Sequence, residues 1–275
     1  MTCNHIKNEF TVLMPVYARK DINELFHMAV SSVFKNTLQP KAFVLVVDGP
    51  ISLDLKNQII AFEINHHIQV IWLPKNVGIA NALNIGLEKI QTEWVIRADA
   101  DDYNLPNRFS ELVKLMTSDM DIVGSAIEEV DRDGLKIAVR SPPLKHNDII
   151  DFARYRNPFN HMAVAYRTKI ALMCGGYPNI FLKEDYALWA LMFQNGARSA
   201  NTSKILVKAT TGKDMYKRRG GLRYAKSEIE LQYHLVACGV KGIFPAILHG
   251  FVRSIIFIMP QFIRGWIYVN FLRKQ

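Results

Sequence analysis

The sequence predicts an α/β protein with a mostly parallel central sheet and helices on both of its faces. Short apolar runs alternate with segments of about a dozen residues that carry apolar side chains at helical spacing. Alternation of this kind is typical of parallel sheets, because each parallel strand pair needs a crossover helix. The expected strands are residues 10–15, 42–47, 68–72, 94–98 and 121–125, and the expected helices are 21–34, 53–65, 79–90 and 185–195.

Composition and cysteine usage narrow the class of protein further. The chain has 275 residues, of which 49% are hydrophobic and 21% charged, as in an ordinary globular protein. Its three cysteines are scattered without metal-ligand spacing, which argues against a disulfide framework or a zinc site. Residues 1–9 are polar and contain no apolar signal core, so we expect a cytoplasmic protein.

The formal charge of +9 is concentrated at the C-terminal end. Residues 204–275 contain 13 Lys and Arg against three acids, a balance of +10, so residues 1–203 are close to neutral. A basic segment of this kind suits nucleic acid, anionic lipid or a phosphorylated substrate.

Polar signatures follow four of the expected strands. They are Pro15-Val16-Tyr17, Asp48-Gly49-Pro50, Asn76-Val77-Gly78 and the acidic run Asp99-Ala100-Asp101-Asp102. Open α/β sheets bind ligands at the carboxyl ends of their strands. The coincidence of these four signatures predicts a binding site at that edge of the sheet.

The acidic run predicts a site for a divalent cation. Carboxylates crowded at a strand end repel one another, and a hard cation with oxygen ligands relieves that repulsion. The alternative is a solvated acidic turn in which Asp102 caps the next helix.

Two further segments are candidates for acceptor chemistry. Glu184-Asp185 precedes an aromatic helix, where a carboxylate can take a proton from an attacking hydroxyl; charge matching to the helix dipole explains the same acids equally well. Asn160-His161-Met162 suits an acceptor pocket, although a lone histidine is usually structural.

In their order, these motifs resemble the family 2 glycosyltransferases of the GT-A fold, particularly the bacterial O-antigen and polysaccharide type. The resemblance covers residues 10–225. It is carried by the opening strand and its loop, Val46-Val47-Asp48-Gly49, Asn76-Val77-Gly78, Arg97 to Asp102, Asn160-His161-Met162 with Tyr166-Arg167, and Glu184 to Trp189. One departure is that many members have two acids after the second strand, whereas here Asp48 is followed by Gly49.

The resemblance implies a Rossmann-like GT-A domain that performs an inverting, metal-dependent transfer from a UDP-sugar. Asp185 would be the catalytic base, and Asp101 with Asp99 would hold Mn²⁺ or Mg²⁺. Asp48 would contact the uracil, and Asp99 the ribose or the waters of the metal. The implied donor site comprises Pro15, Val16, Tyr17, Asp48, Asn76, Gly78, Arg97 and Asp99. The implied acceptor and phosphate site comprises His161, Glu184, Arg218 and Arg219.

The resemblance and the basic segment at 204–275 together predict two parts of the chain. These are a glycosyltransferase domain at 1–225 and a membrane-associating segment of amphipathic helices at 226–275. Residues 242–263 are strongly apolar, with His249, Arg253 and Arg264 on a narrow polar stripe. An in-plane membrane helix is favoured over packing on the catalytic domain or a spanning helix. We therefore expect a peripheral protein on the inner face of the inner membrane, with a polyprenyl-diphosphate-linked sugar as acceptor.

Other functions fit the sequence less well. A nucleic-acid-binding protein would need basic residues interleaved with aromatic ones, whereas here the basic residues alternate with long apolar stretches, so no nucleic-acid partner is expected. A metal-dependent phosphatase or nucleotidyl transferase is the alternative from another class, since it could use the same acidic run. No G-x-G-x-x-G follows the first strand, which disfavours a dehydrogenase. Glucose or galactose is the expected sugar; another UDP-sugar or a soluble acceptor remains the alternative.

Overall fold

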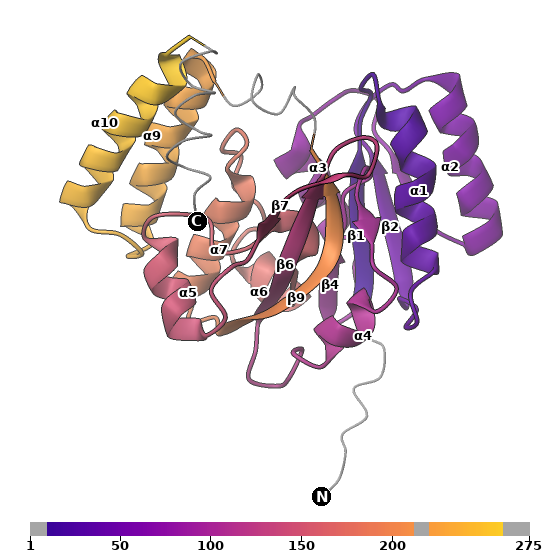
Figure 1. Ribbon diagram of the computed structural model, residues 1–275, viewed down its shortest axis with the longest axis horizontal. Helices are drawn as coiled ribbons and strands as arrows, with labels where there is room; N and C mark the ends of the chain where they lie inside the picture. The colour runs from indigo at the N-terminus through magenta and orange to yellow at the C-terminus, as the bar shows by residue number, and fades with distance from the viewer. Residues whose placement is uncertain (1–9, 212–219, 261–275) are drawn as a thin grey trace, which may run out of the picture.

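The computed structural model describes residues 10–211 and 220–260, and within them nine strands form one mixed sheet (Figure 1). The strand order is β3-β2-β1-β4-β8-β6-β9-β5, and β7 pairs with β6. The strands are β1 (Phe10–Val16), β2 (Ala42–Val47), β3 (Gln69–Trp72), β4 (Trp94–Arg97), β5 (Tyr103–Asn104), β6 (Ile122–Val130), β7 (Lys136–Arg140), β8 (Ala165–Arg167) and β9 (Ser199–Thr210).

The first four strands are parallel to one another, as expected from the alternating pattern. β6 and β9 are also parallel to each other, while β8 runs antiparallel to β4 and β6 between them. The prediction of an α/β fold with a mostly parallel sheet is therefore confirmed. Its consequence for function is that the loops after β1, β2, β3 and β4 meet at one edge.

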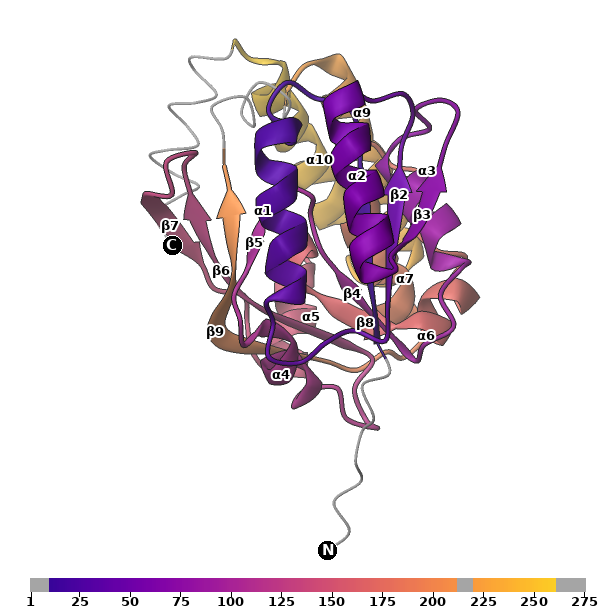
Figure 2. The same cartoon turned by 90° about the vertical axis from the view of Figure 1, so that its right-hand side faces the viewer.

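Helices cover both faces of the sheet. Successive side chains of a strand point to opposite faces, so the buried strands contribute apolar residues to both layers. Phe10, Val12 and Met14 of β1 face one side, where they pack with α1 (Ile22–Phe34), α2 (Leu53–His66) and α4 (Arg108–Val113). Leu13 faces the other side and packs in the cluster of α3 (Ile79–Leu87) and α7 (Glu184–Gln194). Figure 2 shows α1 and α2 in front of the sheet.

The middle stretch 141–176, for which the sequence indicated no clear elements, supplies four short ones. They are α5 (His146–Ala153), a 3₁₀ turn (His161–Ala163), β8 and α6 (Thr168–Met173). The turn between β6 and β7 closes a hairpin, in which the Asp131 carboxylate accepts hydrogen bonds from the backbone of Asp133 and Leu135.

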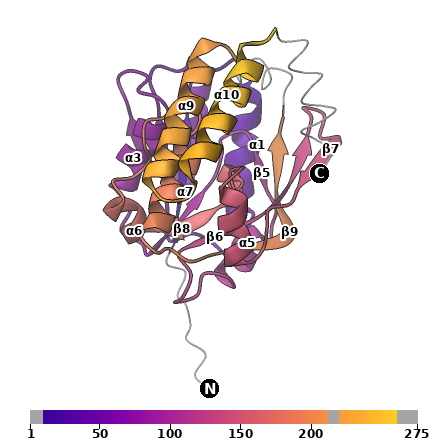
Figure 3. The same cartoon turned by 90° about the vertical axis from the view of Figure 1, so that its left-hand side faces the viewer.

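The C-terminal described residues form a helical hairpin, α9 (Leu222–Ala237) and α10 (Ile243–Ile258). The two helices lie side by side on the outer side of α7 (Figures 1 and 3). Leu231 and Leu235 of α9 pack with Ala187 and Ala190 of α7. The expected boundary between residues 225 and 226 falls inside α9.

One face of α10 is apolar and exposed, and the other packs on α9. No helix in residues 10–211 or 220–260 is long and apolar enough to cross a membrane. His249 and Arg253, two members of the expected polar stripe, both make contacts within the protein. His249 bonds to Lys241, and Arg253 bonds to Glu228 of α9 and to the backbone of Tyr155, so this stripe faces the protein. Arg264 lies outside the described residues.

Candidate active site

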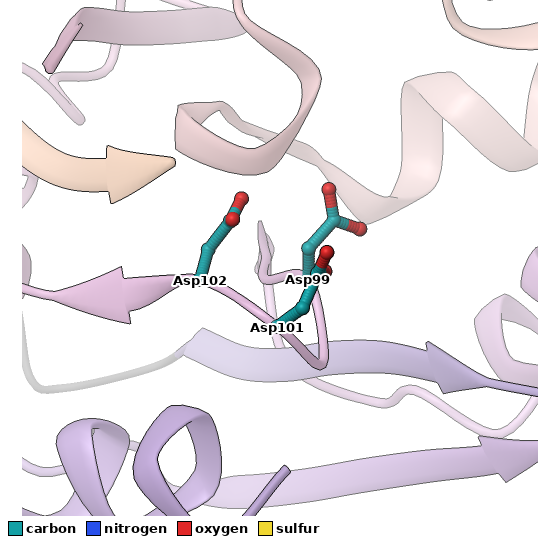
Figure 4. A group of neighbouring side chains, drawn as sticks. All are labelled: Asp99, Asp101 and Asp102. Carbon is teal, nitrogen blue, oxygen red and sulfur yellow. The ribbon is translucent and has the colours of Figure 1, made fainter. Parts of the chain in front are cut away.

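The acidic run lies directly after β4, and its three carboxylates gather in one small volume (Figure 4). Asp99, Asp101 and Asp102 each offer an oxygen, and these oxygens lie within 4.8 Å of one another. Asp99 and Asp101 are half-buried, and Asp102 is buried. Asp102 accepts a hydrogen bond from the backbone N–H of Thr210, and α4 has Asn107 at its N-cap position. The alternative in which Asp102 caps the next helix is therefore wrong.

Arginines supply the positive charge that keeps these acids together. Arg97, fully buried, donates to Asp99 at 2.5 Å, and Arg19 donates to Asp101 at 2.6 Å. Arg108, also fully buried, donates to the carbonyl of Arg97 at 2.6 Å. Burial, against the attraction of Asp102, lowers the pKa of Arg108 to about 9.

The three acids differ in how well they are neutralised. Burial raises the pKa of Asp102 well above its ordinary value, and the charges of Asp101 and Asp99 raise it further. Burial and Asp99 also raise the pKa of Asp101, despite the opposing effect of Arg19. Asp99 is the exception: Arg97 and His161 outweigh its burial and lower its pKa.

This donor set fits a hard divalent cation. Carboxylate oxygens are the ligands that Mg²⁺ and Mn²⁺ prefer, and a cation would remove the repulsion that raises the pKa of Asp101 and Asp102. Asp101 and Asp99 remain the predicted ligands, and Asp102 is close enough to join them.

The predicted donor residues lie around the same edge. Pro15 and Val16 end β1, and the exposed Tyr17 follows them. Asp48, after β2, accepts hydrogen bonds from the backbone N–H groups of Val77 at 2.7 Å and Gly78 at 3.1 Å.

Asp48 thus ties together the loops after β2 and β3. Asn76 completes the link, because its side-chain amide donates to the Asp48 carbonyl at 3.1 Å. Gly49 has φ +92°, and a Cβ there would lie 2.6 Å from the nitrogen of Asn76. A second acid after Asp48 would be strained in this backbone. The uracil contact of Asp48 remains a prediction.

The acceptor candidates Glu184 and His161 lie close to each other. Asp185 accepts a hydrogen bond from the Asn157 side chain at 2.6 Å. His161 lies 3.9 Å from Glu184 and 3.3 Å from the hydroxyl of Tyr177. Asp185 and Asp99 both oppose the lowering of the His161 pKa, which indicates that the imidazole lies near both carboxylates.

Burial and charge set the protonation of these groups. Burial, reinforced by Arg97, lowers the pKa of His161 to about 4, so the imidazole is neutral at pH 7. Burial, reinforced by Asp185, raises the pKa of Glu184 to about 8. At pH 7 most Glu184 therefore keeps its proton, which avoids a second negative charge beside Asp185.

Sequence reasoning missed three residues of this site and named two that the structure does not describe. Arg19 lies two residues after Tyr17 of the predicted donor loop, so its position in the sequence could have identified it as a site residue. No motif in the sequence identifies Asn157 or Arg108 as site residues. Arg218 and Arg219 lie outside the described residues.

Comparison with known proteins identifies the family. Residues 11–184 match the model of Glycosyl transferase family 2, and the chain belongs to that family. The protein is therefore a glycosyltransferase, as the order of its motifs predicts.

Two curated relatives match almost end to end. The chain is 36% identical to the UDP-Gal:alpha-D-GlcNAc-diphosphoundecaprenol beta-1,3-galactosyltransferase of Escherichia coli, with 97% of each chain covered. It is 35% identical to the amylovoran biosynthesis glycosyltransferase AmsE of Erwinia amylovora, with 94% of this chain and 97% of the relative covered.

A solved structure supports the fold. The mannosyltransferase PcManGT of Pyrobaculum calidifontis, in complex with GDP-Man and Mn²⁺, superposes with a TM-score of 0.60 over 94% of this chain and 82% of its own, at 15% identity.

The arrangement of Arg19 predicts competition between a side-chain cation and a metal ion at Asp101. We expect Arg19→Gln to tighten Mn²⁺ binding to the UDP-free protein by about three- to tenfold, because the partly buried ion pair no longer has to be broken. The same variant should bind UDP more weakly in the presence of Mn²⁺, since a guanidinium suited to diphosphate is lost. Calorimetric titration with MnCl₂ and then UDP measures both.

The matched control is Arg132→Gln. Arg132 is exposed and bonds at 3.0 Å to Asp21, which is also a partner of Arg19, but it does not contact the acidic cluster. Its removal should leave Mn²⁺ affinity unchanged. Unchanged or weaker Mn²⁺ binding in Arg19→Gln would show that Arg19 does not compete for the site.

Proposed function

We propose that this protein is an inverting, metal-dependent galactosyltransferase that moves galactose from UDP-galactose to a sugar linked to a polyprenyl diphosphate. The observation that carries the proposal is the end-to-end match to an Escherichia coli enzyme whose name states that reaction. AmsE, a second end-to-end relative, is named for the synthesis of a bacterial polysaccharide. The product would then be an intermediate of O-antigen or surface polysaccharide synthesis.

The donor half of the mechanism follows from the strand-end loops. Asp48 fixes the loops after β2 and β3, which with Pro15, Val16 and Tyr17 would form the nucleotide pocket. Asp101 and Asp99, with Asp102 beside them, would hold Mn²⁺ or Mg²⁺. When bound, such an ion stabilises the negative charge of the departing nucleoside diphosphate. Arg97 holds Asp99 as a carboxylate through their hydrogen bond.

The acceptor half centres on Asp185. In this proposal Asp185 takes the proton from the acceptor hydroxyl while that oxygen attacks the anomeric carbon, the bond to UDP breaks, and one displacement inverts the configuration. Asn157 orients the carboxylate by its hydrogen bond at 2.6 Å. His161, neutral at pH 7, and the protonated Glu184 line the same side without adding charge.

The rival reactions are less well supported. A phosphatase or nucleotidyl transferase could use the acidic cluster alone, whereas family membership and the pairing of Asp185 with Asn157 favour transfer to a hydroxyl. A family member that uses another UDP-sugar or a soluble acceptor remains the alternative, and a substrate panel separates the two.

The exposed face of α10 supports association with the membrane that carries the acceptor lipid. Phe244 is 80% exposed, Ile247 67% and Phe251 66%, and the spacing of these residues places them on one side of the helix. An apolar helix face within a stretch of sequence as basic as residues 204–275 suits the interface of an anionic bilayer. We therefore place the protein peripherally on the inner face of the inner membrane, with α10 in contact with lipid and α9 joining it to the glycosyltransferase domain.

A substrate panel tests the reaction. We expect galactose transfer from UDP-galactose to a synthetic GlcNAc-diphosphate-lipid, with little transfer from UDP-glucose, UDP-GlcNAc or UDP-GalNAc. EDTA should abolish the activity, and Mn²⁺ or Mg²⁺ should restore it. Mass spectrometry of the lipid product gives the answer. Transfer only to free GlcNAc, or release of phosphate without a new glycoside, would overturn the proposal.

Removing the base tests the mechanism. Asp185→Asn keeps the size of the side chain and an oxygen that can accept from Asn157, but it can no longer take a proton. Transfer should fall about 100- to 10,000-fold, the usual contribution of a positioned base, while UDP affinity stays the same. Asp151→Asn, at an exposed carboxyl on α5, is the control and should keep full activity. Substantial turnover by Asp185→Asn would remove Asp185 from this role.

Polar substitutions on α10 test the membrane proposal. Phe244→Gln with Phe251→Gln should weaken binding to vesicles that contain anionic lipid at least about tenfold, because each buried aromatic side chain contributes about 1.5–3 kcal/mol. The control, Ile64→Gln with Met173→Gln, changes residues that are 68% and 73% exposed on other helices. Equal vesicle sedimentation of both double variants would show that α10 does not contact lipid.

A further inference from the structure

A buried carboxylate joins the C-terminal hairpin to the rest of the protein. Glu228, in the middle of α9, has no exposed surface. One of its oxygens lies 2.9 Å from the ammonium of Lys183, and the other accepts from Arg253 at 3.2 Å and from Gln232 at 2.8 Å. Lys183 and Arg253 outweigh the effect of burial and lower the pKa of Glu228, so its charge persists on folding.

The first of these partners, Lys183, adjoins the proposed base in the sequence. Lys183 is the residue immediately before Glu184 and Asp185, at the N-cap of α7. Its ammonium also lies over the rings of Tyr224, on α9, and Phe257, on α10, at 4.6 and 5.5 Å. Leu182, just before it, has φ +54°, a left-handed conformation that its side chain disfavours. The hairpin thus holds the chain at a strained turn that leads into Asp185.

The second partner reaches the segment that orients Asp185. Arg253 donates to the backbone carbonyl of Tyr155 as well as to Glu228. Tyr155 stands two residues before Asn157, whose side chain donates to Asp185 at 2.6 Å. The base and the amide that orients it come from different elements, α7 and the loop after α5. Both elements are therefore bonded to Glu228, each through one cation.

We infer that Glu228 is a positioning residue, which fixes the relative placement of Asp185 and Asn157 through Lys183 and Arg253. The inference rests on the proposed role of Asp185 as the base. The hairpin of α9 and α10 then has a second role besides presenting the apolar face of α10. The geometry around Asp185 depends on how the two helices pack against the rest of the protein. A displacement of about 1 Å at a reacting group is enough to slow catalysis substantially.

The test compares two neutralised glutamates on the same helix. Glu228→Gln should lower kcat for galactose transfer about 10- to 100-fold, while the KM for UDP-galactose and the affinities for UDP and Mn²⁺ change less than twofold. Hydrogen exchange of the full-length protein should increase at residues 153–160 and 180–187 and stay the same around Asp101. Glu230→Gln is the control, since Glu230 is half-exposed and pairs only loosely with Lys226 at 3.8 Å. It should match the wild type in every measurement.

A second variant separates positioning from stability. Glu228→Gln leaves Lys183 buried beside a neutral group, which lowers the melting temperature. Adding Lys183→Met removes that unpaired charge, so the double variant should recover much of the melting temperature while kcat stays low. Recovery of kcat together with melting temperature would overturn the inference, as would a wild-type kcat in Glu228→Gln.

Failure of the proposed reaction gives a different result. If the wild-type protein transfers no galactose, the kinetic comparison is void, but the hydrogen-exchange comparison of Glu228→Gln with Glu230→Gln still reports whether Glu228 orders the two segments. Equal exchange in both variants would refute the positioning role whatever the reaction.

Discussion

The structure of the site depends on the crowding of three carboxylates at the end of β4. Oxygens of Asp99, Asp101 and Asp102 lie within 4.8 Å of one another, and like charges at this separation cannot all persist without cations. Arginine side chains supply the compensating positive charge, and they fall into two groups by burial. Arg97 and Arg108 are fully buried behind the cluster and form part of the core, whereas Arg19 is partly exposed and approaches Asp101 from the loop after β1. The buried pair holds the acidic loop through hydrogen bonds to Asp99 and to the Arg97 carbonyl, and Arg19 reaches Asp101 from the loop that we propose to bind the nucleotide.

Much of the fold could be predicted because three parallel strands of its first half, β1, β2 and β4, are almost completely buried. Such strands appear in the sequence as short apolar runs, and their carboxyl ends collect the polar motifs at one edge. β5 and β8, with two and three residues, are too short to show a pattern. They become strands only because longer neighbours offer them hydrogen-bonding partners, which is a tertiary effect.

The site was predictable where a motif lies at a strand end and unpredictable where two distant segments meet. Arg19 and Asp101 are 82 positions apart, and Asn157 and Asp185 are 28 apart, so no local spacing indicates either pair. The polar stripe on α10 illustrates the same limit. His249 and Arg253 lie on one side of the helix as the sequence predicts, but their partners on and near α9 turn that side inward. Periodicity identifies a face, whereas only tertiary contacts decide what the face meets.

The proposed donor and acceptor sides of the site are held by different parts of the fold. The proposed donor side is held by the sheet, since Asp48 and the acidic cluster follow β2 and β4. The Asp48 carboxylate accepts from the backbone N–H groups of Val77 and Gly78, and the Asp102 carboxylate accepts from that of Thr210. The proposed acceptor side is held by helices, where burial keeps the proton on Glu184 and the Asn157 amide donates to the carboxylate of Asp185. A carboxylate in a partly buried site is effective as a base only while its orientation is maintained. That orientation comes from contacts outside the sheet, on the side of the molecule where α9 and α10 lie. The part of the chain that faces the acceptor lipid in our proposal is thus the same part that steadies the group acting on the acceptor.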